Sequence, residues 1–394
     1  MIKIQDATLN LPILQRVQKR SFAAGGIFLA LCIGGALSNP DQFFRSYLFA
    51  FVFWSGIPLG SLAILMLQYL TGGAWGIMIR RLLEASTRTL PILAALFVPI
   101  FFGMQHLYEW AQPEKVKADK ILQHKAPYLN IPFFALRTVV YFLAWYSLIY
   151  FFNKWSQQQD DNKAAQTKFN AESLSGPGLV IFGATATFAS FDWVMSLEPH
   201  WYSTIFGMYY MIGQTLTTFS FTILVLILLA ERKPLSEVLS PEHLHDLGKL
   251  TLAFVMIWAY LSFSQFLIIW SGNLPEETPY YLKRLANGWW WLQLALILFH
   301  FALPFILLLS RSLKRAPRQL IKVASLILFM RLIDLFLLIA PTGHDGHFRI
   351  HWMDLAALLG IGGVWLGVFC RTLITRPVLP VHDPAFEEAL QGGH

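Results

Sequence analysis

A small number of ionisable side chains interrupt the long apolar stretches of this sequence. Arg331 and Asp334 are three residues apart, so on a helix they share one face and can form an ion pair. Asp192 has no oppositely charged residue at helical spacing, and Arg137 or His106 on a neighbouring helix is its expected partner. Ionisable groups inside a membrane span are costly and often functional, although a structural ion pair is an equally open interpretation of each.

Other ionisable residues fall near the ends or within the apolar stretches. Glu109 lies close to His106, and His300 falls near the middle of its stretch. Glu198 and His200 flank a proline in a tight turn. Acids and bases gathered near one membrane face can accept protons, or surround the head of a quinol, whose oxidation requires proton acceptors. The candidates for a proton path or a quinol site are Asp192, His106, Glu109, Arg137, Arg331, Asp334, Glu198, His200 and His300.

These residues predict a polar path that opens to one side of the membrane. Its expected members are Asp192, His106, Glu109, Arg137, Arg331 and Asp334. The other half of the spans offers almost no ionisable residues, so a continuous side-chain path across the membrane is not predicted. We expect Asp192→Asn to lower coupled proton movement or quinol turnover while the protein still assembles.

The sequence favours no metal or redox centre on this chain. His344, Asp345, His347 and His351 have the side chains of a zinc or copper site, but such clusters are common in solvated loops, and Arg349 lies among them. The two cysteines form neither C-x-x-C nor C-x-x-C-H, which argues against iron–sulfur, thiol-redox and covalent haem sites. A haem b held by His106 and His300 is disfavoured because the two residues differ in depth.

The elements that position these residues follow from composition. The chain has 394 residues, of which 56% are hydrophobic and 13% charged, with a mean hydropathy of +0.51. A soluble domain is about 25% charged, so the chain is expected to be an all-α, polytopic bundle of transmembrane helices. Ten apolar windows are long enough to span a bilayer: 21–38, 43–70, 88–108, 131–152, 177–197, 201–230, 250–272, 288–310, 319–340 and 352–374.

Basic residues orient this arrangement. When alternate connecting segments are assigned to one side, most of the 30 Lys and Arg residues fall on the side of both termini, which is therefore expected to be cytoplasmic. Residues 1–20 form the cytoplasmic N-terminal segment, 21–374 the transmembrane domain and 377–394 a cytoplasmic tail. The polar stretch 153–175 is expected to be a flexible linker. The net charge of +7 then reflects loops facing anionic lipid, not nucleic acid.

Residues 188–207, FASFDWVMSLEPHWYSTIFG, resemble the ActF-type, NrfD/PsrC-like membrane subunit of bacterial alternative complex III. The motif contains Asp192, Trp193, Glu198, Pro199, His200 and Trp201. The resemblance implies two four-helix bundles with flanking helices, in a quinol:cytochrome c oxidoreductase of the bacterial inner membrane. It also implies partner subunits: an iron–sulfur subunit, c-type cytochromes and a sibling NrfD-like subunit that holds the main quinol site. This chain would then contribute a periplasm-facing proton path and scaffold, without a redox centre of its own.

Three alternatives stay open. The chain could itself bind quinone within the same kind of complex. It could be a stand-alone secondary transporter, although such proteins usually place a substrate site near the midplane of a repeated fold, and no repeat is evident here. It could also be a purely structural anchor, in which case neutralising the intramembrane acids would have no functional cost.

Overall fold

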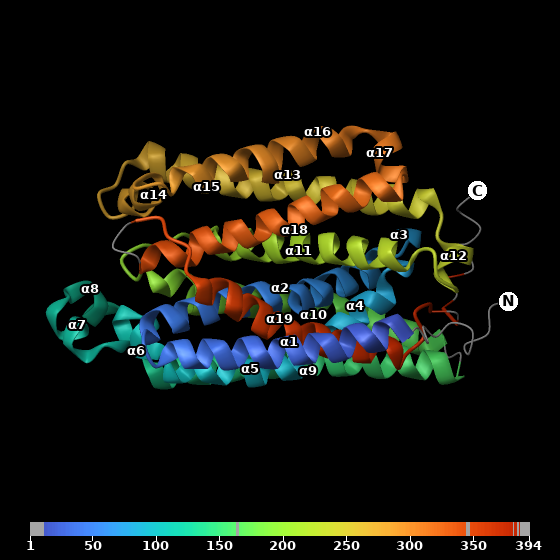
Figure 1. Ribbon diagram of the computed structural model, residues 1–394, viewed down its shortest axis with the longest axis horizontal. Helices are drawn as coiled ribbons and strands as arrows, with labels where there is room; N and C mark the ends of the chain where they lie inside the picture. The colour runs from blue at the N-terminus through green and yellow to red at the C-terminus, as the bar shows by residue number, and fades with distance from the viewer. Residues whose placement is uncertain (1–11, 163–164, 344–346, 381, 384–385, 387–394) are drawn as a thin grey trace.

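The computed structural model describes residues 12–162, 165–343, 347–380, 382–383 and 386. Within these residues the chain is helical and has no strand (Figure 1). The long helices are α1 (Pro12–Ala36), α2 (Pro40–Thr71), α5 (Leu90–Phe102), α9 (Ile131–Asn162), α10 (Ala165–Trp193), α11 (Phe206–Leu229), α13 (Pro241–Gly272), α18 (Pro317–Ile339) and α19 (Trp352–Ile374). The short ones are α3 (Ala74–Ile77), α4 (Arg80–Thr87), α6 (Met104–Leu107), η2 (Glu109–Ala111), α7 (Pro113–Ala118), α8 (Lys120–Lys125), η3 (Met195–Leu197), α12 (Leu235–Val238), α14 (Thr278–Leu285), α15 (Trp290–Ala295), the π-helix η4 (Leu296–Ala302), α16 (Leu303–Leu309), α17 (Arg311–Arg315) and η5 (Ala340–Thr342).

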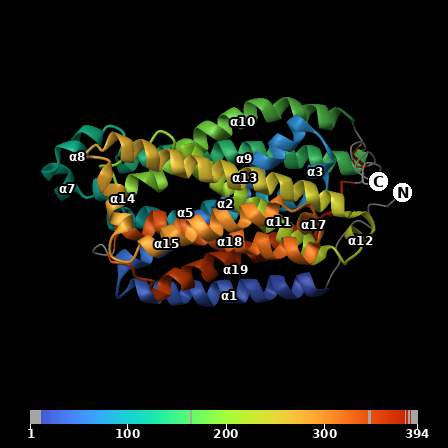
Figure 2. The same ribbon diagram turned by 90° about the horizontal axis from the view of Figure 1, so that it is seen from above.

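The expected all-α polytopic bundle is confirmed. Nine helical spans among the described residues are long and apolar enough to cross a membrane. Successive spans run in opposite directions along one axis, so that α1 begins and α19 ends at the same end of the bundle (Figures 1 and 2). We call this end the Pro12 end. The opposite end, which carries α7, α8 and α14, is called the α14 end.

The first predicted span, 21–38, corresponds to α1, which is not among those nine. It is nevertheless a helix of 25 residues that packs along α19. Its first half carries Arg16, Lys19 and Arg20, and these residues lower its hydropathy. Gly25 and Gly363 bring the two backbones together, because a Cβ atom built on Gly363 would lie 2.6 Å from the Gly25 nitrogen. Close approach through glycine is a common way for membrane helices to associate.

The centre of the bundle is α2. Of its most apolar window, 89% is buried, against 28% for α13 and 22% for the span Trp290–Leu309. Helix α2 packs against α1, α10, α11, α18 and α19. Helices α13 and α15–α16 therefore present most of their apolar side chains outward, as expected of spans that face acyl chains.

Several predicted boundaries were wrong, and two of them concern the polar residues near the Pro12 end. The third span begins at Arg80 and not at residue 88. The polar stretch 153–175 is not a flexible linker in the described residues, because α9 continues to Asn162 and α10 begins at Ala165. Polar side chains at the end of α9 are accommodated because they contact α4 and the C-terminal segment, where Ser156, Gln159 and Asp160 are buried.

Candidate functional site

Four of the predicted residues line one cavity of about 740 Å³ at the α14 end. They are His106, Glu109, Glu198 and His200. We call this space the polar cavity, because Asp41, Arg45, Lys115, Glu276 and Lys283 also line it. The residues come from the start of α2, from the segment between α5 and α9, from the turn before α11 and from the loop around α14. The tight turn predicted at 198–200 thus places both of its ionisable side chains at the cavity.

The two residues that follow α5 have local partners. His106 Nδ1 lies 2.6 Å from Asp41 Oδ1, and Lys115 Nζ donates to Glu109 Oε1 at 2.9 Å. His106 is therefore the partner of Asp41 and not of Asp192. All four of these side chains are more than a third exposed, so they can exchange protons with water.

His200, which also lines the polar cavity, contacts the residue before α8. Its Nε2 atom contacts Asp119 Oδ2 at 2.5 Å, and Asp119 also caps α8 through the backbone amides of Ile121 and Leu122. The hydrogen bond from His200, followed by those from the α8 amides, lowers the pKa of Asp119 below its usual value. The contact joins the 198–200 turn to the segment that carries α7 and α8.

Glu198 is the most enclosed acid of the polar cavity, with 17% of its side chain exposed. Its Oε1 atom accepts from Arg284 Nη2 at 3.0 Å, and Lys283 Nζ lies 3.8 Å away. Arg284 is buried and also donates to the carbonyls of Tyr280, Leu337 and Leu338. Its guanidinium carbon lies 3.6 Å from the centre of the Tyr280 ring. Arg284 falls between the predicted spans 250–272 and 288–310, and its ion pair with Glu198 was missed.

Asp192 and Arg137 form the ion pair expected from the sequence. The pair is bidentate, because Arg137 Nε and Nη2 donate to the two carboxylate oxygens at 2.8 Å each. Tyr141 adds a third hydrogen bond at 2.7 Å, and Arg137 also stacks on Tyr128. Asp192 is fully buried and does not line the polar cavity. A carboxylate with every oxygen engaged in this way is suited to fixing α9 against α10.

Arg331 and Asp334 also form the expected ion pair, on α18. Asp334 accepts further hydrogen bonds from the Tyr209 hydroxyl and from Trp258 Nε1, the latter at 3.2 Å. Arg331 lies against Gly213 of α11, where a Cβ atom would stand 2.2 Å from Arg331 Nη2. The pair thus joins α18 to α11 and α13, and only glycine leaves room for it.

His300 is completely buried in the π-helix η4, and both of its ring nitrogens lack a hydrogen-bond partner among the described residues. Its ring packs edge-on against Trp258, with the centroids 4.2 Å apart. Trp258 in turn donates to Asp334, so His300 is connected to the Arg331–Asp334 group through Trp258. The nine predicted residues therefore divide among the polar cavity, the Asp192 pair and the Arg331–Asp334 group.

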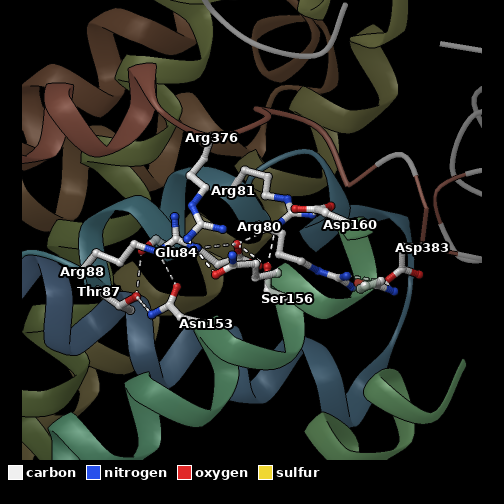
Figure 3. A network of polar contacts seen from close by, with 12 residues as sticks. Arg80, Arg81, Glu84, Thr87, Arg88, Asn153, Ser156, Asp160, Arg376 and Asp383 are labelled. Carbon is white, nitrogen blue, oxygen red and sulfur yellow. Dashed lines mark hydrogen bonds and ion pairs between the residues drawn. The ribbon is translucent and has the colours of Figure 1, made fainter. Parts of the chain in front are cut away.

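A further charged network lies at the Pro12 end and was missed (Figure 3). Arg80 pairs with Asp383, and Arg81 pairs with both Glu84 and Asp160. All five side chains are buried. We call these five residues the terminal network. Under the expected orientation they occupy the half in which almost no ionisable residues were predicted, so that expectation was wrong.

Two signals in the sequence point to the terminal network. Glu84 is three residues from Arg81 and four from Arg88, which are the spacings of helical ion pairs. Arg88 lies 3.8 Å from Glu84 and donates to Asn153 at 2.7 Å, while Ser156 donates to Glu84 at 2.7 Å (Figure 3). Asp383 carries no such signal, because it lies far from Arg80 in the sequence.

No group of three or more His, Cys, Asp or Glu side chains within the described residues is placed to hold a metal ion. His344 and Asp345 lie outside these residues, while His351 caps α19 by accepting from the Met353 amide. Cys32 and Cys370 are buried and unbonded to each other. The chain matches no family model and no curated protein. The resemblance in residues 188–207 therefore stays a prediction.

Proposed function

We propose that this chain is a membrane subunit of a bacterial respiratory quinol:electron-acceptor oxidoreductase, in which it contributes a periplasm-facing proton path and a scaffold. Its helices would form the NrfD/PsrC-like arrangement of two four-helix bundles with flanking helices. Both termini would be cytoplasmic, so the α14 end would face the periplasm. An iron–sulfur subunit, c-type cytochromes and a sibling NrfD-like subunit would carry the electrons and the main quinol site.

The observation that carries this proposal is the position of Glu198. This residue belongs to the motif that resembles the family, and it lies in the polar cavity. Its carboxylate is also bonded to the buried Arg284. A carboxylate that contacts both a solvated cavity and the bundle interior is the arrangement expected at the mouth of a proton path.

The remaining residues of the polar cavity suit proton exchange with bulk water. His106 and Glu109 are exposed groups that can take up or release a proton. Lys283 and Arg284 place two positive charges beside the Glu198 carboxylate, 3.8 and 3.0 Å from its Oε1 atom. Protons would leave the bundle at Glu198 and reach water through the polar cavity.

The two intramembrane ion pairs support the scaffold part of the proposal. Asp192 joins α9 to α10, and Asp334 joins α18 to α11 and α13. Each carboxylate accepts three hydrogen bonds from side chains, an arrangement suited to holding packed helices in place.

Purification from native membranes tests membership of a complex. A tagged chain extracted in mild detergent should bring with it c-type haem absorbance and the electron paramagnetic resonance signals of iron–sulfur clusters. The proposal would be contradicted if the chain were isolated alone, and if both signals stayed in the membrane extract after the chain had been captured from it. That result would favour the transporter alternative.

A further inference from the structure

A second cavity, of about 710 Å³, lies between α11, α13, α14, η4 and α18. We call it the lateral cavity. Its rim includes Tyr260, Phe263 and Ile297, whose exposed fractions are 68%, 62% and 58%. These side chains belong to α13 and η4, two of the least buried spans. In a bilayer such residues face acyl chains, so the lateral cavity opens toward lipid and can admit a molecule dissolved in the membrane.

One wall of the lateral cavity presents a hydrogen-bond acceptor without a donor. Gln265 is 6% exposed and lines the cavity. Its Nε2 atom donates to the Tyr281 hydroxyl at 3.2 Å, whereas its buried Oε1 atom has no hydrogen-bond partner among the residues that the structure describes. A buried acceptor left unsatisfied destabilises a protein by about 1–3 kcal/mol. A ligand that brings a hydroxyl to this position would remove that cost.

The charges around the lateral cavity are balanced. Arg284 lines it but is paired with Glu198, and Asp334 lines it but is paired with Arg331. Arg284 is further engaged by the carbonyls of Tyr280, Leu337 and Leu338. No excess charge is therefore available for a phosphate or a carboxylate, and an uncharged head is favoured.

We propose that the lateral cavity binds an uncharged amphiphile from the bilayer. Its hydroxyl donates a hydrogen bond to Gln265 Oε1, and its tail leaves between α13 and η4. The aromatic side chains of Trp258, Phe266 and Tyr281 line the space in which the head lies. Both a hydroquinone and a diacylglycerol have this chemistry. The site goes beyond the proposed proton path and does not depend on it.

Binding is measured with the full-length protein in nanodiscs. Labelled decyl hydroquinone, decyl benzoquinone, dioleoylglycerol and phosphatidylglycerol serve as probes. At least one of the two hydroxyl-bearing, uncharged probes should bind saturably, and comparison of the two identifies the source of the ligand. Gln265→Leu should weaken that binding about 5-fold, the value of one neutral hydrogen bond. Decyl benzoquinone has no hydroxyl to donate, so its binding should be the same in both proteins.

Two further variants serve as controls. Gln123→Leu changes a glutamine on α8, away from the lateral cavity, and should bind as the wild type does. Ala259→Phe fills the cavity from α13 and should abolish saturable binding, which tests the site even if Gln265→Leu does not fold. The proposal is overturned if neither decyl hydroquinone nor dioleoylglycerol binds, or if phosphatidylglycerol binds as tightly as they do. It is also overturned if Ala259→Phe, or a folded Gln265→Leu, binds them as the wild type does.

Discussion

Arg284 and Glu198 form an ion pair, 3.0 Å from Nη2 to Oε1, at the boundary between the polar cavity and the lateral cavity. Arg284 comes from a short amphipathic helix outside the spans, yet its guanidinium is buried and bonded to the carbonyls at the end of α18. The pair thus attaches α14 and the 198–200 turn to the bundle, and it sets the charge around Glu198.

Replacing Arg284 with Gln should destabilise the protein. The change leaves two carbonyls of α18 without their charged donor and Glu198 without its closest partner. Removing one member of a buried ion pair costs about 3 kcal/mol of unfolding free energy. Unfolding by sodium dodecyl sulfate in mixed micelles measures the loss. Lys283→Gln is the matched control, because Lys283 is 35% exposed and 3.8 Å from Glu198. Equal stability of the two variants would contradict the structural role of Arg284.

Asp192→Asn is now expected to act on stability first. Arg137 would keep its burial but lose the opposite charge, at a cost of about 3 kcal/mol. The same unfolding assay should therefore show a large loss for Asp192→Asn and a small one for Asp41→Asn, since Asp41 is exposed. A stable Asp192→Asn protein with lowered proton movement would instead show that Asp192 belongs to the proton path, as the sequence indicated.

Gly213→Ala should disrupt the Arg331–Asp334 group. The added methyl would lie 2.2 Å from Arg331 Nη2, and the guanidinium that would have to shift is buried and paired with Asp334. Overpacking of this kind costs about 2 kcal/mol. Gly183→Ala on α10 is the control, because a Cβ atom there meets nothing within 4 Å. A pair of variants with equal melting temperatures would show that Arg331 is not held where the structure places it.

Asp383→Asn should release the C-terminal segment from the terminal network. Arg80 would lose the opposite charge of Asp383, whose carboxylate also accepts from Gln159 Nε2 at 3.2 Å. We expect proteolytic cleavage after α19 to accelerate about tenfold, since cleavage follows the population of the open form. Asp246→Asn, which changes an exposed pair with Lys249, should leave the rate unchanged. Protection that persists in Asp383→Asn would argue against the ion pair as the attachment.

The helical bundle could be predicted because apolar composition and span length follow directly from the bilayer. Two of the intramembrane ion pairs could also be predicted. Arg331 and Asp334 are three residues apart, and Asp192 had few partners at its depth. Four residues of the polar cavity were found as candidates because they lie at the ends of predicted spans.

What could not be predicted depends on contacts between distant segments. Arg284 and Asp383 occupy polar stretches that the basic-residue rule assigns to solvent, and only the fold shows that they are buried. Gln265 is not ionisable and was therefore not considered, although its Oε1 atom, which lacks a partner among the described residues, lies at the lateral cavity. The division of the candidates among three places likewise follows from helix packing and not from their spacing.

The proposed proton path is tested most directly by proton release from the proposed complex in proteoliposomes, compared between the wild type and Glu198→Gln. Glutamine has the size of glutamate and still accepts from Arg284, so the complex should assemble with its full haem content. We expect quinol-driven proton release to fall at least about tenfold in Glu198→Gln, whereas Glu276→Gln, on the same cavity, should have little effect. Undiminished proton release in a fully assembled Glu198→Gln complex would contradict a proton path through Glu198.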